Sequence, residues 1–350
     1  MSEYYDIRAA LDTLVRGEDL SRDEMISSMR QIMTGNAGDA QIGAFLMGLY
    51  LKGESLDEIE GAVEVMRELS TKVPLDGPHL VDIVGTGGDG ANLFNISTAA
   101  AIVVAAAGGR VAKHGNRSVS STTGSADVLE AAGVRLGIAP EQVAACVDEL
   151  GIGFMFAPAH HSAMRHAIGP RRELGMRTIF NIVGPLTNPA GVQNMLIGVF
   201  DVELCRPLAE VMGRLGAEHV MVVHSEDGLD EISLAAPTFA AQFRHGVLGD
   251  RNLTPEDFGT EAATLDGLEV NTAEESLALI RSALTAEADE RALRAARLIA
   301  LNAGAALYVA GLASGLSDGF TRASKVIADG SAWARLEQLA AKTQIGRAHV

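Results

Sequence analysis

The spacing of hydrophobic residues in the first part of the chain is helical, and no β-like run interrupts it. Apolar side chains recur every three or four positions, which predicts about four short helices. Two of the expected helix starts carry a capping-box pattern, Ser21 with Glu24 and Ser55 with Glu58. We therefore expect a small helical domain over residues 1–73.

Beyond residue 80 the pattern changes to short β-like runs that alternate with helical runs. Strands are predicted at 80–84, 110–112, 153–156, 194–200 and 219–224, helices at 98–107, 126–132, 140–150, 202–215, 274–315 and 332–341, and a β-rich excursion at 233–259. This alternation predicts an α/β domain with a mostly parallel sheet. We assign residues 74–344 to it, and residues 345–350, which fit neither period, to a tail.

Composition and charge narrow the classes of function. The 350-residue chain has a formal net charge of −17 without a long block of lysine and arginine, so nucleic-acid or anionic-membrane binding is disfavoured as its main role. The two cysteines, Cys146 and Cys205, lie in helix-like apolar patterns and are expected to be buried thiols in a reducing compartment. No signal peptide and no segment long and apolar enough to span a bilayer is evident, so we expect a cytoplasmic protein.

A glycine-rich turn follows the first predicted strand. Gly85, Gly87 and Gly90 fit the G-x-G-x-x-G pattern of a dinucleotide-binding fold. That fold requires an acidic residue at the next strand to bind a ribose, whereas this chain has Lys113 there. A tight turn without a ligand is the alternative. Successive glycine N–H groups form an anion-binding nest, which favours a phosphate or pyrophosphate ligand.

Polar residues gather after this turn. Asn95, Ser97 and Thr98 begin the next helix and would serve as N-caps or as phosphate donors. The stretch 113–127 is the most polar of the chain and carries lysine, arginine, asparagine and several serines. It is either a flexible surface loop or a binding site for a phosphorylated sugar, and we favour the second interpretation.

Two further groups of charged residues have a structural and a functional interpretation. Arg171 and its neighbours would pair with surface carboxylates, or one of them would bind a substrate carboxylate as a fork. Asp230 and Glu231 follow a predicted strand, where they would be solvated or would bind Mg²⁺ together with phosphate oxygens.

Several of these stretches, in order and over nearly the whole chain, resemble the anthranilate phosphoribosyltransferase family. The matching stretches are 85–89, 95–98, 113–118, 124–127, 171–175, 177–189 and 227–231. The resemblance implies a fold of the nucleoside phosphorylase and phosphoribosyltransferase type, in which a middle segment at about 160–190 joins the helical domain. It also implies an active site between the domains, a homodimer formed through the helical domains, and a role in tryptophan biosynthesis.

The resemblance further implies that the chain transfers the phosphoribosyl group of 5-phosphoribosyl 1-pyrophosphate (PRPP) to the amine of anthranilate. Contacts to PRPP are implied for Gly85, Gly88, Asp89, Asn95, Ile96, Ser97, Thr98, Lys113, His114, Gly115, Asn116, Arg117, Ser118, Val119, Ser120, Ser121 and Ser125. Gly85, Asn116 and Arg171 would contact anthranilate, and Ser97, Asp230 and Glu231 would hold Mg²⁺.

No general base is assigned, although Lys113 and His114 are candidates for electrostatic or positioning roles. Leu93 stands where the family usually has threonine or serine, which would remove one hydroxyl contact to PRPP. Two rival functions use the same scaffold, a pyrimidine nucleoside phosphorylase and a non-catalytic nucleic-acid-binding relative. The negative charge disfavours the latter.

Overall fold

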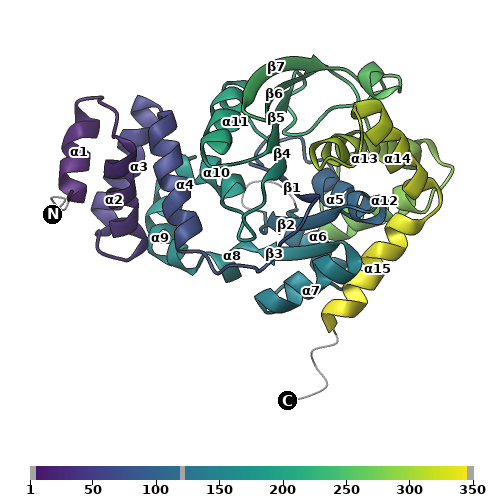
Figure 1. Ribbon diagram of the computed structural model, residues 1–350, viewed down its shortest axis with the longest axis horizontal. Coiled ribbons are helices and arrows are strands. Elements are labelled where there is room, and N and C mark those ends of the chain that lie inside the picture. Colours follow the sequence, from purple (N-terminus) through teal and green to yellow (C-terminus); the bar gives the residue numbers. More distant parts are fainter. Residues whose placement is uncertain (1–4, 119–122, 345–350) are drawn as a thin grey trace. The chain divides into compact units, whose positions relative to one another are not determined.

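The computed structural model describes residues 5–118 and 123–344, which form two compact units (Figure 1). One unit comprises Met1–Lys72 and Pro158–Gly191, and the other comprises Val73–Ala157 and Val192–Val350. The chain therefore leaves the first unit after the N-terminal helices and returns to it once.

The first unit is helical. Its helices are α1 (Ile7–Val15), α2 (Arg22–Met33), α3 (Asp39–Lys52), α4 (Leu56–Glu68), η1 (Ser162–Met164), α9 (Arg165–Leu174), α10 (Ile179–Val183) and η2 (Gly184–Thr187), and the short α8 (Ala157–His160) leads into the returning segment. The expected capping boxes of α2 and α4 are confirmed: Ser21 with Glu24, and Ser55 with Glu58. Met25, Phe45 and Leu49 are among its fully buried side chains.

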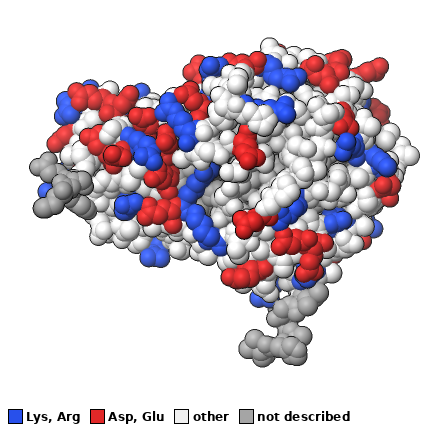
Figure 2. Space-filling view, viewed as in Figure 1, with Lys and Arg blue, Asp and Glu red and all other residues white. Residues whose placement is uncertain are grey.

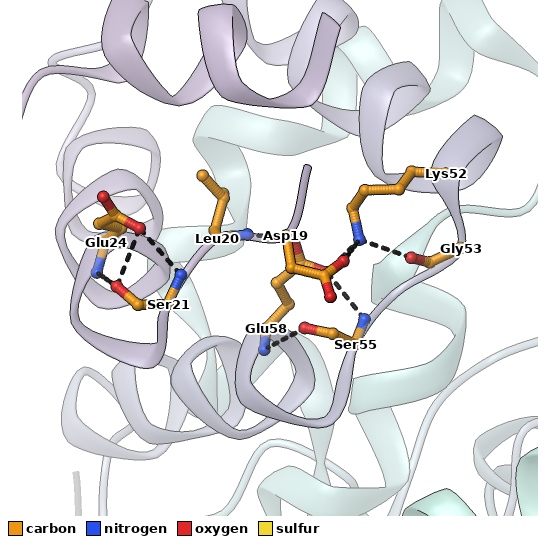
Figure 3. A network of polar contacts seen from close by, with 8 residues as sticks. All are labelled: Asp19, Leu20, Ser21, Glu24, Lys52, Gly53, Ser55 and Glu58. Carbon is orange, nitrogen blue, oxygen red and sulfur yellow. Dashed lines mark hydrogen bonds and ion pairs between the residues drawn. The ribbon is translucent and has the colours of Figure 1, made fainter. Parts of the chain in front are cut away.

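A buried carboxylate ties three segments of this unit together (Figure 3). Glu58 Oε1 accepts the main-chain N–H of Leu20 at 2.9 Å, and Oε2 accepts Ser55 N–H at 2.7 Å and the Lys52 ammonium at 2.8 Å. The Lys52 ammonium also binds Asp19 at 2.6 Å. Because Glu58 is completely buried, its partners replace the water that it loses on folding.

The second unit is an α/β domain. Its strands are β1 (Leu80–Gly85), β2 (Arg110–Gly115), β3 (Ile152–Phe156), β4 (Asn194–Gly198), β5 (His219–Ser225), β6 (Thr238–Arg244) and β7 (Val247–Leu253). Its helices are α5 (Ile96–Ala106), α6 (Ser125–Ala131), α7 (Pro140–Leu150), η3 (Val202–Leu204), α11 (Cys205–Arg214), η4 (Pro255–Phe258), α12 (Ala273–Leu284), α13 (Glu290–Val309), α14 (Leu316–Ala328) and α15 (Ser331–Gln344).

The sheet has the strand order β3-β2-β1-β4-β5-β6-β7. Strands β3 to β5 in this order are parallel, whereas β6 and β7 are antiparallel to their neighbours. The expected fold class, a small helical domain with a mostly parallel α/β domain, is confirmed, and the β-rich excursion at 233–259 is the β6–β7 hairpin.

Both faces of the sheet are covered, as is usual for parallel strands. Met221 and Val223 of β5 point into the large core that contains α5 and α13, while Val220 and Val222, which alternate with them along the strand, point to the other face, on which α11 packs (Figure 1). The two cysteines lie on α7 and α11, and both thiols are buried as expected. Burial raises the pKa of Cys205 to about 12.

Two expectations about the C-terminal helices need correction. α13 is long and apolar enough to cross a membrane, since an 18-residue window of it has a mean hydropathy of 1.2, but 72% of that window is buried, so α13 is a core helix. α14 was not predicted, because Gly319 interrupts its apolar pattern. A Cβ at Gly319 would lie 2.2 Å from the carbonyl oxygen of Gly304, so this glycine permits close packing of α14 on α13.

Candidate active site

The site begins where the parallel strands end. β1 ends at Gly85, β2 at Gly115 and β4 at Gly198, and the carboxyl ends of parallel strands meet at one edge of a sheet. The loop after β5 carries Asp230 and Glu231 to the same edge. The structure thus brings together the glycine turn, the polar stretch and the acidic pair that the sequence singles out.

The turn after β1 has an unusual backbone. Gly87, Gly88 and Gly90 have positive φ angles of 67°, 81° and 75°, which L-residues with side chains rarely adopt. Gly87 donates its N–H to Oδ2 of Asp230 at 2.7 Å. Asp89 of the same turn lies near the Asp230 carboxyl, and its charge raises the pKa of Asp230. The glycine turn and the loop after β5 therefore meet in direct contact.

Glycines at the strand ends make this contact possible. A Cβ on Gly85 would lie 2.6 Å from Oδ2 of Asp230, and one on Gly198 would lie 1.5 Å from the Asp230 carbonyl oxygen. No side chain fits at either position without moving the acidic loop. Gly198 is absent from our sequence-based site, although a glycine that ends a buried strand is itself a signal of close backbone approach.

Asp230 is buried, and Glu231 is partly buried. Burial and the neighbouring charge of Asp89 raise the pKa of Asp230 to about 7, and burial and the charge of Asp230 raise the pKa of Glu231 well above its usual value. Glu231 Oε1 accepts the N–H of Ser97 from the first turn of α5 at 3.1 Å. Two neighbouring carboxylates that are withdrawn from water favour a cation or a proton between them.

Lys113 supplies a buried positive group. Its side chain is 2% exposed, and its ammonium donates to the carbonyl oxygen of Ile83 at 2.6 Å and lies 3.5 Å from Ser97 Oγ. Burial lowers the pKa of Lys113, while the charges of Asp82 and Glu231 oppose that shift. Lys113 and Ser97 thus border the acidic pair.

The neighbour of Lys113 on β2 lies on the other face of the sheet. His114 is buried, and its main-chain N–H donates to Asp82 Oδ1 at 3.2 Å. Successive side chains of a strand point to opposite faces, so the His114 ring points away from the face on which Lys113 meets Ser97.

The loop after β2 is held by its own ion pairs. Arg117 binds Asp127 at 2.9 Å and Glu130 at 2.8 Å, and its guanidinium lies over the Phe156 ring. These carboxylates raise the pKa of Arg117. Asp127 also accepts the N–H of Ser118 at 3.1 Å, so the near end of the loop is anchored to α6.

The rest of this loop is defined in part. The Ser125 hydroxyl donates to the carbonyl oxygen of Asn116 at 3.3 Å, and a Cβ on Gly115 would lie 2.2 Å from that hydroxyl oxygen. Val119, Ser120 and Ser121 lie outside the described residues.

Hydrogen bonds to Ser276 of α12 hold the start of α5 in place. Asn95 donates its main-chain N–H to Ser276 Oγ at 3.0 Å, and the Ser276 hydroxyl donates back to Asn95 Oδ1 at 2.8 Å. Ile96 and Thr98 are buried at 3% and 1% exposure, so only their main-chain groups are placed to meet a ligand. Ser276 was not identified from the sequence, because a serine in an amphipathic helix gives no distinctive signal.

Arg171 belongs to the helical unit. Its guanidinium carbon lies 5.1 Å from the centre of the Phe180 ring, and burial lowers its pKa. No carboxylate pairs with it in the part of the chain that the structure describes. The neighbouring Arg172 is exposed. Arg171 is therefore a partly buried cation without an anion, and the structural interpretation as a surface ion pair does not apply to it.

The histidine-rich segment of this unit takes part in main-chain contacts. His160 Nδ1 hydrogen-bonds to the carbonyl oxygen of Thr71 at 2.8 Å. Within residues 5–118 and 123–344 no group of three or more histidine, cysteine, aspartate or glutamate side chains is arranged to hold a metal ion. A metal at the acidic pair would therefore need ligands from elsewhere, and Mg²⁺ takes such ligands from phosphate and water.

Comparison with known proteins defines the class first. Residues 8–70 match the family described as "Glycosyl transferase family, helical bundle domain", and residues 77–333 match "Glycosyl transferase family, a/b domain". The chain is 63% identical over 339 residues to the anthranilate phosphoribosyltransferase of Cellvibrio japonicus. The alignment covers 97% of this chain and 99% of that protein. The chain therefore has a relative of nearly its own length throughout both domains.

Solved structures agree. The anthranilate phosphoribosyltransferase of Thermus thermophilus superimposes with a TM-score of 0.89 at 42% identity, covering 96% of this chain and 99% of that one. The Saccharomyces cerevisiae enzyme, in complex with PRPP and Mg, gives 0.86 at 24% identity over 97% and 98% of the two chains, which supports the fold alone. The chain belongs to the anthranilate phosphoribosyltransferase family of glycosyl transferases.

Proposed function

We propose that the chain transfers the phosphoribosyl group of PRPP to the amine of anthranilate, releasing pyrophosphate, as a pentosyltransferase of tryptophan biosynthesis. The assignment of this reaction rests on family membership over nearly the full length of the chain. The observation on this chain that supports it is the Asp230–Glu231 pair, in which the buried Asp230 contacts a glycine turn of positive φ. Such a turn offers N–H donors to a pyrophosphate.

PRPP binds along the carboxyl edge of the sheet in this proposal. The pyrophosphate lies at the glycine turn and at the first turn of α5, where the N–H groups of Gly87 and Ser97 donate to Asp230 and Glu231 and where the positive end of the helix dipole favours an anion. Lys113 adds a positive charge beside Ser97. The loop after β2, from Asn116 to Ser121, and Ser125 receive the ribose phosphate.

The acidic pair fits a divalent cation. The adjacent carboxylates of Asp230 and Glu231, whose pKa values are raised, repel each other, and a cation between them and the substrate would relieve that repulsion. Asp230, Glu231 and the hydroxyl of Ser97 would hold Mg²⁺ with phosphate oxygens and water, as hard oxygen ligands suit this ion. Bound there, Mg²⁺ would neutralise charge on the pyrophosphate.

Arg171 and Asn116 bind anthranilate in this proposal. The guanidinium is partly buried and free of an ion pair among the described residues, which prepares it to receive a carboxylate as a fork. The ring of Phe180 beneath the guanidinium limits its rotation. Gly85 is the third residue proposed to contact anthranilate.

The reaction is a substitution at the anomeric carbon of ribose. The amine nitrogen forms a bond to that carbon, the bond to the pyrophosphate oxygen breaks, and the amine loses a proton to water. Such centres pass through an oxocarbenium-like state, in which negative charge builds on the leaving group. In this proposal the glycine-turn N–H groups and Lys113 stabilise that charge. An arylamine needs no strong base to act as a nucleophile.

We further propose a cytoplasmic homodimer formed through the helical units. Val15 at the end of α1 and Tyr50 and Leu51 at the end of α3 are 87%, 51% and 76% exposed. Large exposed apolar side chains on neighbouring helices are typical of a protein interface. Sedimentation of the purified chain with Leu51→Glu as a variant tests this, since the substitution should favour monomers.

The reaction is tested by the fluorescence of anthranilate in the presence of the purified chain, PRPP and Mg²⁺. Fluorescence should fall, and mass spectrometry should find N-(5-phosphoribosyl)anthranilate. Parallel incubations with a pyrimidine nucleoside and phosphate, and retention on DNA at low salt, test the two rival functions. Nucleoside cleavage without anthranilate consumption would contradict the proposal.

A further inference from the structure

Asn302 is a polar residue in the middle of the apolar core helix α13. It is completely buried, and its neighbours Leu301 and Ala303 are also buried. A buried amide in such a place destabilises a helix core unless all its hydrogen bonds are made. The partners of Asn302 therefore indicate what the amide is for.

Its partners lie in the loop that carries the acidic pair. Asn302 Oδ1 accepts the main-chain N–H of Ile232 at 3.0 Å, and its Nδ2 donates to the carbonyl oxygen of the same residue at 3.0 Å and to that of Leu298 at 3.1 Å. The side chain thus holds one peptide residue by both its main-chain groups. Ile232 directly follows Glu231.

The remaining contacts of this loop show how completely its position is determined. Gly198 touches the main chain of Asp230, and Gly87 binds the Asp230 carboxylate. Asn302 holds the main chain on the other side of Glu231. The two carboxylates therefore lie between a contact before them and a contact after them.

We propose that Asn302 is a positioning residue that fixes the main chain of the acidic loop so that Asp230 and Glu231 can bind a divalent cation together. The inference rests on the proposed function, because it assigns the cation to that pair. Groups that orient metal ligands without touching the metal change metal affinity when they are replaced. The hydrogen bonds of Asn302 to this loop go to the main chain of Ile232, so its effect travels through that main chain.

The test compares Asn302→Leu, which keeps the size of the side chain and removes its hydrogen bonds, with Asn302→Ala, which avoids overpacking if the first variant folds poorly. The probe is Mn²⁺ with inorganic pyrophosphate, and bound Mn²⁺ is measured by loss of the free-ion electron paramagnetic resonance signal. We expect the dissociation constant for Mn²⁺ to rise about tenfold in both variants. The Mg²⁺ concentration for half-maximal velocity should rise similarly, and KM for anthranilate should stay within about twofold of the wild-type value.

Asn194→Leu is the matched control. Asn194 Nδ2 donates to the carbonyl oxygen of Leu80 at 3.2 Å, so it also holds a main-chain group of this unit, but at the opposite edge of the sheet. Its loss should lower the melting temperature without changing Mn²⁺ affinity. A purely structural role for Asn302 predicts the same behaviour for both positions.

Each outcome decides the matter. Weaker Mn²⁺ binding in the Asn302 variants alone supports the proposal. Folded Asn302 variants that bind Mn²⁺ like the wild type, or an equal loss in Asn194→Leu, overturn it while leaving the proposed reaction intact. A wild-type chain that binds no Mn²⁺ with pyrophosphate overturns both this inference and the metal site of the proposed function.

Discussion

The main-chain N–H of Gly87 donates to Oδ2 of Asp230 at 2.7 Å, although 143 residues separate the two positions in the chain. This bond joins the turn after β1 to the loop after β5. The turn is the proposed pyrophosphate site and the loop is the proposed metal site. A change that separates them should weaken both functions at once.

Gly85→Ala should have this effect. The added methyl group would meet Asp230 Oδ2 at 2.6 Å and push the acidic loop away from the turn. We expect kcat/KM for PRPP to fall about 100-fold, because small displacements of catalytic groups are costly. Steady-state kinetics with PRPP as the varied substrate measures the change.

Gly137→Ala provides the control for that experiment. A Cβ at Gly137 would meet no atom within 4 Å. Its kinetic constants should match those of the wild type. Equal losses in the two variants would show that the Gly85 effect is not local.

Arg171→Ala should weaken anthranilate binding selectively. The variant loses a charge-assisted fork to the substrate carboxylate, and we expect KM for anthranilate to rise at least about tenfold with little change in KM for PRPP. Arg172→Ala, on the same helix but exposed, should have no effect. If both Michaelis constants rise equally in Arg171→Ala, the residue has a structural role.

Glu58→Ala should destabilise the helical unit. It leaves Leu20 N–H and Ser55 N–H without their acceptor and removes a buried partner of Lys52 (Figure 3). Breaking a buried ion pair from one side costs about 3 kcal/mol. Urea unfolding followed by circular dichroism measures the loss.

A surface ion pair of the same unit is the comparison. Arg30 and Glu68 are 51% and 50% exposed, so Glu68→Ala should cost less than about 1 kcal/mol. A similar cost for the two variants would mean that burial does not determine the contribution of Glu58.

His219 should make stability depend on pH. Burial, reinforced by the charge of Arg244, lowers its pKa to about 4, below the usual value of about 6.5 in an unfolded chain. The folded state therefore binds fewer protons than the unfolded state between these values. The contribution is complete above pH about 6.5 and is lost as the pH falls toward 4, by at most about 3 kcal/mol.

The difference in melting temperature between wild type and His219→Phe measures this contribution at pH 7.5 and pH 5. His219 packs edge-on against Tyr308, so phenylalanine retains the aromatic contact. The variant should lose less stability than the wild type on acidification. An unchanged pH dependence would exclude His219 as its source.

Much of the fold follows from local patterns in the sequence. Capping boxes at Ser21 and Ser55 and the alternation of strands and helices determine the two kinds of structure, because they depend on neighbouring residues. α14 escaped prediction since Gly319 serves a contact with α13, which only the tertiary structure contains. The apolar composition of α13 is compatible with a buried core helix and with a membrane span, and only the tertiary structure distinguishes the two.

The site follows a similar division. The glycine turn, Lys113, Arg171 and the acidic pair carry chemical signals of their own. Gly198 and Asn302 act through main-chain contacts with residues distant in the sequence, so the sequence contains no specific signal of their roles. The signs that were available are a lone asparagine in an apolar helix and a glycine at the end of a buried strand.

PRPP is an anion, and the chain has a net charge of −17. Figure 2 shows how charged side chains are distributed on one face. On the face shown, acidic and basic side chains are interspersed over much of the surface, and several basic side chains adjoin one another near the middle of the view. Because the surface potential is mixed, recognition of PRPP depends on local groups such as the glycine turn and Lys113. Moderate salt should therefore change KM for PRPP little.

The most direct test measures pyrophosphate release together with the loss of anthranilate fluorescence as Mg²⁺ is varied, for the wild type, Glu231→Gln and Asp227→Asn. Asp227 accepts the Ser233 hydroxyl at 2.6 Å, a bond that asparagine can keep, so this variant is the control. We predict equal amounts of pyrophosphate and consumed anthranilate in the wild type and Asp227→Asn, only with Mg²⁺, and a rate about 100-fold lower in Glu231→Gln. A rate that does not fall when Mg²⁺ is chelated, or that is the same in Glu231→Gln as in the wild type, would contradict the account.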